Sequence, residues 1–378
     1  MTLIRSTLCS AFVCLVLLTG SAFATTPTTE LLYVQQGQNI ITYSVNTTTA
    51  VTKKLSTLST AYNGATKITI NRSGSFLYLL GFSPAQEYFT VYSLTTAGVP
   101  DAKPIQTLVV KPALKQFLIH PNGKIAYALF KWTETVDGTY EVASDVVLFT
   151  VNPKTGKLTN TTKPVANYPL SAISETSMTP GINTKGTVLY TVAKLLHDNL
   201  VTYYGSTINA ETGALGMPAF LISGNPRFTA IGDTAIAHIY KLGPEDINNI
   251  LVFPNPTSTA NFTEFQCFYE NLSVCGDLNG QNIWMHPSSA YIFFYDYSLN
   301  EVPILYINTL KGELEESRAG LQSIPGNPST IGFSPDGLLV YAVEGTEILV
   351  YVFNPHSGLL TARTIINAPG VLSILPWV

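Results

Sequence analysis

Charged residues are scarce in this sequence. Asp, Glu, Lys and Arg make up 12% of its 378 residues, the formal net charge is −4, and the basic residues form no patch. Proteins that bind nucleic acids neutralise phosphates with clustered Lys and Arg. Nucleic acid is therefore excluded as the expected partner.

Long apolar runs are missing from most of the chain. One such run, Leu8–Leu18, follows the cationic Arg5 and precedes Ala22-Phe23-Ala24, which has the form of a cleavage site. A membrane-spanning helix needs about 18 or more uninterrupted apolar residues, and no later stretch reaches that length. We expect residues 1–24 to be a cleaved signal peptide and residues 25–378 to form one domain, secreted or periplasmic, without a membrane span.

Cysteine is also rare, and two of the four cysteines lie within the expected signal peptide. The other two, Cys267 and Cys275, have seven residues between them and would reach an oxidising compartment. Further ligands at close spacing, which a zinc site needs, are missing around them. We expect a Cys267–Cys275 disulfide that stabilises the domain by about 2–3 kcal/mol.

Motifs that identify common enzyme classes are absent. The sequence has no G-x-S-x-G nucleophile elbow, no H-E-x-x-H metal motif, no C-x-x-C motif and no G-x-G-x-x-G phosphate-binding loop. We therefore expect no cofactor and no dedicated metal site.

The abundant residues indicate an all-β protein. The chain contains 20 Tyr and 18 Phe beside many Val, Ile and Thr, which favour strands, and 27 Gly and 23 Pro, which favour turns. The segment Ser329–Arg363 shows the resulting pattern most clearly. Its strands are separated by tight turns at Ser334–Gly337 and Asn354–Gly358, which combine Pro, Asp or Asn with Gly. It predicts one four-stranded antiparallel meander.

The two turns of this meander recur along the chain with a period of about 50 residues. Copies of the first turn occur at Asn71–Gly74, His120–Gly123, Asn183–Gly186 and His286–Ser289. Copies of the second occur at Asn152–Gly156, Asn209–Gly213 and Asn308–Gly312, with a degenerate copy at Asn255–Ser258. They divide the chain into seven units: Leu31–Leu58, Thr66–Val109, Gln116–Val165, Thr176–Ile222, Arg227–Asn271, Gln281–Ala319 and Thr330–Ile365.

The first unit lacks an opening strand, and the segment Gly370–Trp377 is a strand with no unit of its own. Together they complete a blade. We therefore predict a seven-bladed β-propeller of four-stranded antiparallel blades, closed by the C-terminal strand joining the N-terminal blade, which leaves no sheet edge between the chain ends.

The F-S-P-D-G-x-x-x-Y-A-V and V-Y-x-F-N-P-x-S-G-x-L-T elements of Ser329–Arg363 resemble the YVTN-type repeats of lactonase-like seven-bladed propellers. Bacterial 6-phosphogluconolactonase and fungal muconate cyclase belong to this group. The resemblance covers nearly the whole mature chain and implies the fold. It implies a lactonase activity less directly, because the family's His-rich stretch leading to D-L-G-x-D has only Asp198 as a counterpart.

Candidate functional residues gather in the loops between the second and third strands and in the crossovers between blades, which share one face of a propeller. His120, His286 and His356 belong instead to the tight turns of the opposite face, where we interpret them as structural or solvated. The candidates for catalysis are Arg227, Glu175, Asp198 and His197, and those for ligand binding are Trp132, Tyr140, Asp296 and Glu344. Trp132 and Tyr140 lie in Lys131–Ser144, the longest predicted loop insertion.

Two functions remain open. The first is a non-catalytic scaffold that binds a small carbohydrate, a lactone or an envelope protein through the loop face. The second is a lactone hydrolase or muconate-type cyclase, in which Arg227 polarises a carbonyl and a carboxylate activates water. Carboxylates on the same face could also bind a divalent cation. We expect a monomer in either case.

Overall fold

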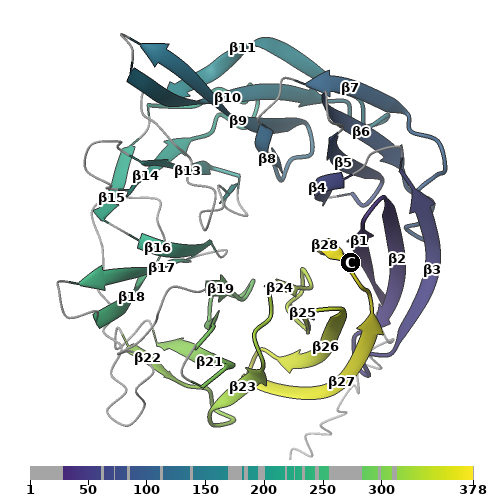
Figure 1. The fold of residues 1–378 in the computed structure, drawn as a ribbon, viewed down its shortest axis with the longest axis vertical. Helices are drawn as coiled ribbons and strands as arrows, with labels where there is room; N and C mark the ends of the chain where they lie inside the picture. Colours follow the sequence, from purple (N-terminus) through teal and green to yellow (C-terminus); the bar gives the residue numbers. More distant parts are fainter. Residues whose placement is uncertain are drawn as a thin grey trace, which may run out of the picture.

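The computed structural model of the protein describes residues 29–60, 64–71, 73–82, 86–110, 114–136, 139–168, 181–182, 186–194, 201–217, 219–224, 226–231, 235–242, 247–254, 283–296, 299–308 and 313–377. These residues form seven antiparallel sheets arranged in a ring, so the protein is an all-β propeller (Figure 1). Within this part of the chain, no helix is long and apolar enough to cross a membrane.

We number the sheets from the N-terminus and list their strands from the centre of the ring outwards. Sheet 1 contains β28 (Val371–Trp377), β1 (Thr29–Gln36), β2 (Asn39–Asn46) and β3 (Thr52–Ser59). Sheet 2 contains β4 (Gly64–Ile70), β5 (Phe76–Phe82), β6 (Glu87–Ser93) and β7 (Gln106–Val110). Sheet 3 contains β8 (Leu114–Ile119), β9 (Ile125–Val136), β10 (Thr139–Val151) and β11 (Leu158–Tyr168). Sheet 4 contains β12 (Gly181–Ile182), β13 (Val188–Lys194), β14 (Val201–Thr207) and β15 (Ala219–Gly224).

Sheet 5 contains β16 (Pro226–Ile231), β17 (Ala235–Leu242) and β18 (Ile247–Pro254). Sheet 6 contains β19 (Ile283–Met285), β20 (Tyr291–Phe294), β21 (Glu301–Asn308) and β22 (Glu313–Glu316), and β23 (Gln322–Pro325) also pairs with β21. Sheet 7 contains β24 (Thr330–Phe333), β25 (Leu339–Glu344), β26 (Glu347–Asn354) and β27 (Leu359–Asn367).

The predicted four-stranded antiparallel blades are confirmed, but the predicted count of seven complete blades is not. Six sheets have four or five strands and are complete blades, whereas sheet 5 has three strands in the described part of the chain. A fourth strand of sheet 5 would fall in residues 255–282, which lie outside the described residues together with Cys267 and Cys275.

The ring closes as the sequence predicts. The C-terminal strand β28 pairs antiparallel with β1, from Leu31 opposite Trp377 to Gln36 opposite Val371. Strands from the two ends of the chain therefore lie side by side in one blade (Figure 1). Hydrogen bonds between β28 and β1 therefore hold the first and last parts of the propeller together.

The burial of each strand follows its place in the blade. In the middle strands β25 and β26, the apolar residues between the strand ends are consecutive and almost all are buried. The outer strand β7 alternates between half-buried and exposed residues. The middle strands of a blade are covered on both faces by the neighbouring blades. Only the outer strands have one face exposed, and they therefore alternate between buried and exposed residues.

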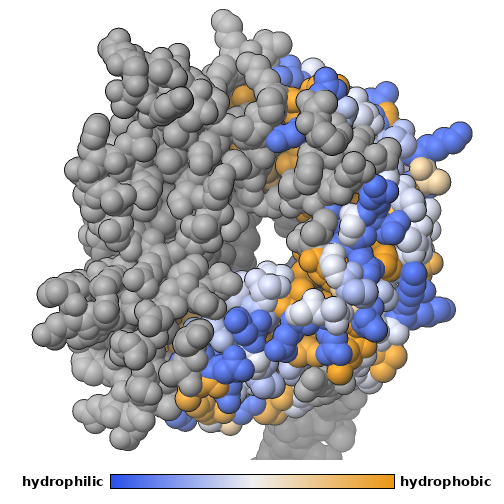
Figure 2. Space-filling model, in the orientation of Figure 1, coloured by the Kyte–Doolittle hydropathy of each residue, from blue (hydrophilic) through white to orange (hydrophobic). Residues whose placement is uncertain are grey.

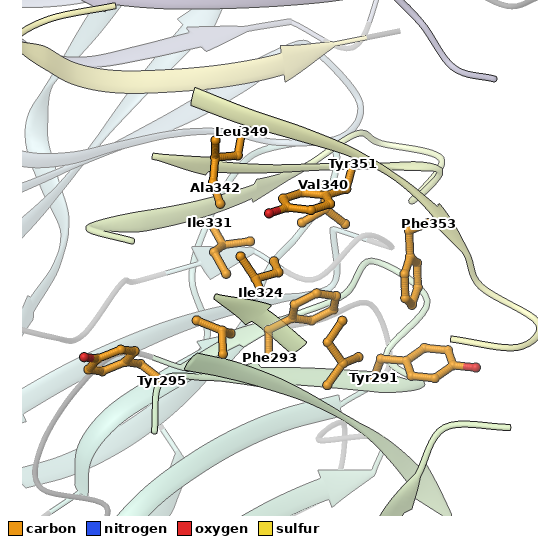
Figure 3. Close-up of a cluster of buried hydrophobic side chains, with 12 residues drawn as sticks. Tyr291, Phe293, Tyr295, Ile324, Ile331, Val340, Ala342, Leu349, Tyr351 and Phe353 are labelled. Carbon is orange, nitrogen blue, oxygen red and sulfur yellow. The ribbon is translucent and has the colours of Figure 1, made fainter. Parts of the chain in front are cut away.

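Aromatic rings fill the junction between sheets 6 and 7 (Figure 3). The rings of Tyr291 and Phe293 in β20 lie 5.2 and 5.7 Å from that of Phe353 in β26. Phe293 also contacts Phe333 of β24, with ring centroids 4.9 Å apart. These edge-on contacts each add about 0.5–1.5 kcal/mol to the area that the rings bury.

The outer tight turns of sheets 1, 3, 4 and 7 owe their shape to an asparagine at their first position. The side-chain oxygens of Asn152, Asn209 and Asn354 each accept hydrogen bonds from the two amides that lie two and three residues further on. A glycine with positive φ then ends each turn. Asn46 makes the same bonds in sheet 1, but there the positive-φ residue is Ala50, which is why the repeat pattern missed this copy.

Neighbouring blades are joined by hydrogen bonds from tyrosines in their second strands. Each hydroxyl donates to the carbonyl of the positive-φ glycine in the next blade's outer turn. A Cβ on these glycines would clash with an apolar side chain of the preceding blade: Leu31, Phe76 or Leu148. The bonds run from Tyr33 to Gly98 at 2.6 Å, from Tyr78 to Gly156 at 3.0 Å and from Tyr127 to Gly213 at 2.9 Å.

Two histidines also join neighbouring blades, which confirms their interpretation as structural turn residues. In His120, Nδ1 accepts the Asn122 amide and Nε2–H donates to the Gly186 carbonyl at 2.7 Å. His286 makes the equivalent bond to Gly337 at 2.9 Å, and burial lowers the pKa of its imidazole. His286 is therefore neutral at neutral pH. His356 is exposed in its turn.

Candidate functional site on the loop face

The second-to-third-strand loops and the crossovers between blades lie on the same face of the ring, which we call the loop face. Its described parts include the loops that follow β1 and β25, part of the loop that follows β20, the start of the crossover that follows β3, and the crossovers from β23 to β24 and from β27 to β28. The ring keeps an opening at its centre in the space-filling view (Figure 2). A ligand on the loop face would therefore meet several blades at once.

The crossover from β23 to β24 is hydrogen-bonded to the loops on either side of it. The Gly326 amide donates to the Asn300 carbonyl at 2.9 Å, and the Asn327 amide donates to Oε1 of Glu344 at 3.3 Å. Asn300 has a φ of 51° and accepts the Tyr295 hydroxyl at 2.8 Å. A Cβ on Gly326 would meet the Glu344 carboxylate, so a larger residue there would displace this carboxylate.

The crossover from β27 to β28 follows the same plan. The Ala368 amide donates to the Thr346 carbonyl at 2.8 Å, and Gln36 Nε2 donates to the Pro369 carbonyl at 2.6 Å. In sheet 1, the Thr60 amide and hydroxyl both donate to the Gln38 carbonyl at 2.8 Å. From sheet 6 to sheet 1, each crossover is thus bonded to a neighbouring loop, and this part of the loop face forms an ordered rim.

The charges described on this rim have one sign. On the loops and crossovers that the structure describes, every charged side chain is a carboxylate: Glu87, Asp296, Glu301, Glu344 and Glu347. Glu347 is exposed, and Glu301 and Glu344 are half-buried. These five carboxylates give the described part of the rim a negative potential, which there favours neutral or cationic ligands over anionic ones. In the described part of the chain, no cluster of three or more His, Cys, Asp or Glu side chains could hold a metal ion.

Two predicted ligand-binding residues, Asp296 and Glu344, lie on this rim in adjacent blades. Asp296 is 2% exposed and its Oδ1 accepts the Leu299 amide at 3.3 Å, so it shapes the turn between β20 and β21. Glu344 is half-buried and holds the crossover through Asn327. Contact with a ligand stays a prediction for both, and the half-buried Glu344 is the better placed.

The predicted loop Lys131–Ser144 is largely a β-hairpin, which corrects the sequence-based prediction. β9 continues to Val136 and β10 begins at Thr139, so these strands have 12 and 13 residues. Alternating Thr, Val and Tyr around the dipeptide Asp137-Gly138 is a hairpin signal that explains the extension. The backbones of Trp132 and Tyr140 belong to this hairpin, with Trp132 opposite Ala143. Their role in binding stays a prediction.

The arrangement of the four predicted catalytic residues stays a prediction. Glu175, His197 and Asp198 lie outside the described residues. Arg227 belongs to the innermost strand of sheet 5, where the pairing with β17 shifts register between Pro226 and Phe228. Sequence reasoning did not single out Asn300, Gln36 and Gln38, because Asn300 and Gln38 bind crossovers through backbone carbonyls, which any residue has, and only Gln36 uses its side-chain amide.

Neither a protein-family model nor a curated protein matches the sequence. Solved structures do match it. The periplasmic gluconolactonase of Pseudomonas aeruginosa is 14% identical, with a TM-score of 0.63 over 92% of this chain and 99% of that one. Candidate 6-phosphogluconolactonases from Bacteroides uniformis and Bacteroides fragilis are each 15% identical, with TM-scores of 0.61 over 92% and 93% of this chain and 99% of theirs. The chain has the fold of these β-propellers. At this identity, the likeness establishes the fold and leaves the activity open.

Proposed function

We propose that the protein is a secreted or periplasmic scaffold that binds an uncharged, hydroxyl-rich ligand, such as a carbohydrate or sugar lactone, through its loop face. The observation that carries this proposal is the ordered rim, whose described charges are all carboxylates. Carboxylates and amides accept and donate the charge-assisted hydrogen bonds that sugar hydroxyls offer. Bound crossovers keep these groups in place before a ligand arrives, which lowers the entropy lost on binding.

The acidic rim also argues against phosphorylated ligands. A phosphate would approach four described carboxylates that are exposed or half-buried, and it would find no Lys or Arg among the described side chains of the rim. Binding of phosphorylated sugars normally depends on such basic groups. The preferred ligand class is therefore neutral.

A lactone hydrolase is the second candidate function, favoured by the likeness to a gluconolactonase over almost the whole of that chain. In this hypothesis Arg227 polarises the lactone carbonyl, and Glu175 or Asp198, assisted by His197, activates water. The acidic rim favours a neutral lactone over a phosphorylated one. It also disfavours a muconate-type cyclase, since muconate is a dianion.

The remaining expectations belong to the same proposal. We propose seven complete blades in a monomeric mature chain, with a fourth strand of sheet 5 supplied by residues 255–282. That segment would also contain the Cys267–Cys275 disulfide.

Glu344→Gln tests most directly whether the loop face binds the ligand. The amide oxygen can still accept the Asn327 amide, so the crossover stays in place, while the charge at the rim is lost. We expect about tenfold weaker binding of a glycan identified on an array, because a hydrogen bond to a charged group contributes about 1.5–3 kcal/mol. Glu211→Gln, in an exposed turn on the opposite face, is the matched control and should leave the affinity unchanged.

The mature protein should be screened against glycans and a panel of sugar lactones. Specific glycan binding without lactone hydrolysis supports the scaffold. Hydrolysis that Arg227→Ala abolishes supports the enzyme instead. If neither screen gives a signal and the loop face retains an envelope protein from extract, the ligand of the scaffold is a protein and not a carbohydrate.

A further inference from the structure

The junction between sheets 7 and 1, where the ring closes, differs from the junctions between sheets 3 and 4 and between sheets 6 and 7. At two other junctions the first residue of the inner tight turn is a histidine that donates to a glycine carbonyl of the next sheet. In sheet 7 this position is Ser334. Sheet 1 has no inner turn to accept the bond, because its two inner strands are β28 and β1 from opposite ends of the chain. The side chain of Glu30 lies there instead.

Glu30 is a buried carboxyl group without a hydrogen-bond donor. Its side chain is 0% exposed, and neither of its oxygens accepts a hydrogen bond that meets ordinary geometry within the described residues. It lies beside Asp336 and Ser334 of the β24–β25 turn. Oδ1 of Asp336 is already bound by the Ser334 hydroxyl at 2.7 Å and the Leu338 amide at 2.9 Å. Two carboxyl groups therefore meet at the closure.

The surroundings supply no positive charge to Glu30 among the described residues. Among the described residues, the other titratable groups that face Glu30 and Asp336 are Tyr341 from sheet 7, Tyr43 from the same face of β2, and the neutral His286, which lies near Asp336 from sheet 6. The Tyr341 hydroxyl is buried and has no hydrogen-bond partner in the described part of the structure. A carboxylate at this place would be both desolvated and repelled.

We propose that Glu30 and Asp336 hold a single proton between them at the ring closure, so that the contact between the first and last sheets weakens as pH rises. The proton turns Glu30 into a donor toward Asp336 and removes one of two adjacent negative charges. Burial, and then the hydrogen bond and charge of Asp336, raise the pKa of Glu30 to about 9. The closure of the propeller is thereby coupled to the pH of its compartment.

The sign of the coupling follows from the two states of Glu30. The unfolded carboxyl releases its proton near pH 4.5, whereas the folded one keeps it to about pH 9. Between these values the folded state binds more protons, so stability falls as pH rises. His286 acts in the opposite sense, because its lowered pKa makes stability fall as the pH drops below about 6.5. The difference between wild type and a Glu30 variant isolates the carboxyl pair.

Glu30→Gln tests the proposal, since glutamine keeps the shape and is neutral at every pH. We expect the melting temperature of the variant to match wild type near pH 4.5 and to exceed it by about 5 °C at pH 8. Infrared spectra at pH 7 should show the carbonyl stretch of a protonated carboxyl in wild type, and the variant should lack it. Glu211→Gln should change neither measurement.

Asp336→Asn provides a second variant, because its side-chain oxygen can still accept the Leu338 amide. We expect it to flatten the fall in melting temperature above pH 7, since one of the two charges is gone. Three results would overturn the proposal: a Glu30→Gln effect that is independent of pH, the absence of the infrared band in wild type, or a melting temperature that calcium raises and chelation lowers. The last would show that a metal cation, and not a proton, bridges the pair.

Discussion

Removing residues 371–378 is expected to abolish the native unfolding transition or to lower its midpoint by about 15 °C or more. β28 makes all the hydrogen bonds that cover the inner edge of β1, and it also contacts β4 and β24 of the adjacent sheets. Val371 and Ile374 pack on the apolar cluster between sheets 7 and 1. Losing several such side chains forfeits roughly 1.5–3 kcal/mol each, which together approaches the whole stability of a domain.

Circular dichroism melts and gel filtration of the truncated protein would measure this effect. A protein that lacks only Val378 serves as the control and should behave as wild type. Adding a peptide of residues 370–378 to the truncated protein should restore part of the stability, because an extended peptide can add to an open sheet edge. A truncated monomer that melts like wild type would show that β28 does not close the ring.

Gly156→Ala is expected to destabilise the protein by about 3–5 kcal/mol. Gly156 has a φ of 67°, and a Cβ there would lie within 2.4 Å of the Phe76 ring of the neighbouring blade. The substitution therefore adds a clash between blades to the strain of a left-handed backbone, and it disturbs the bond from Tyr78 to the Gly156 carbonyl.

Gly123→Ala separates the two causes. Gly123 has the same φ of 67°, but a Cβ there would have no neighbour within 4 Å. This variant should be destabilised only by the cost of a left-handed backbone at alanine, about 1 kcal/mol. Urea unfolding of both variants gives the comparison. Equal losses in the two variants would mean that the glycine–aromatic contact between blades contributes little to stability.

The repeat unit made most of the fold predictable, because strand pairing within a blade is local and its turns need particular residues. Closure of the ring was also predictable, since the two ends of the chain complete one another's blade. Two details were not. Ala50 occupies a position where glycine marked the other turns. The segments on either side of the Asp137-Gly138 dipeptide are strands, whereas the sequence predicted a loop there.

The candidate site was less predictable, for a physical reason. Whether a loop carboxylate contacts solvent or a backbone amide depends on the neighbouring blade, and a repeat pattern does not contain that information. Asp296 is nearly fully buried in its turn, whereas Glu344 is half-buried and bonded to the Asn327 amide, yet both look alike in sequence. Glu30 gave no signal either, because its burial results from contact with Asp336, three hundred residues away.

The central claim is that the loop face is an ordered, acidic surface for a neutral ligand. The most direct test is a calorimetric titration of the mature protein with glucono-1,5-lactone and with its 6-phosphate ester, which differ only in the phosphate. We expect the uncharged lactone to bind at least about tenfold more tightly, with the difference shrinking at high salt, where the repulsion is screened. Tighter binding of the phosphate ester would contradict the claim.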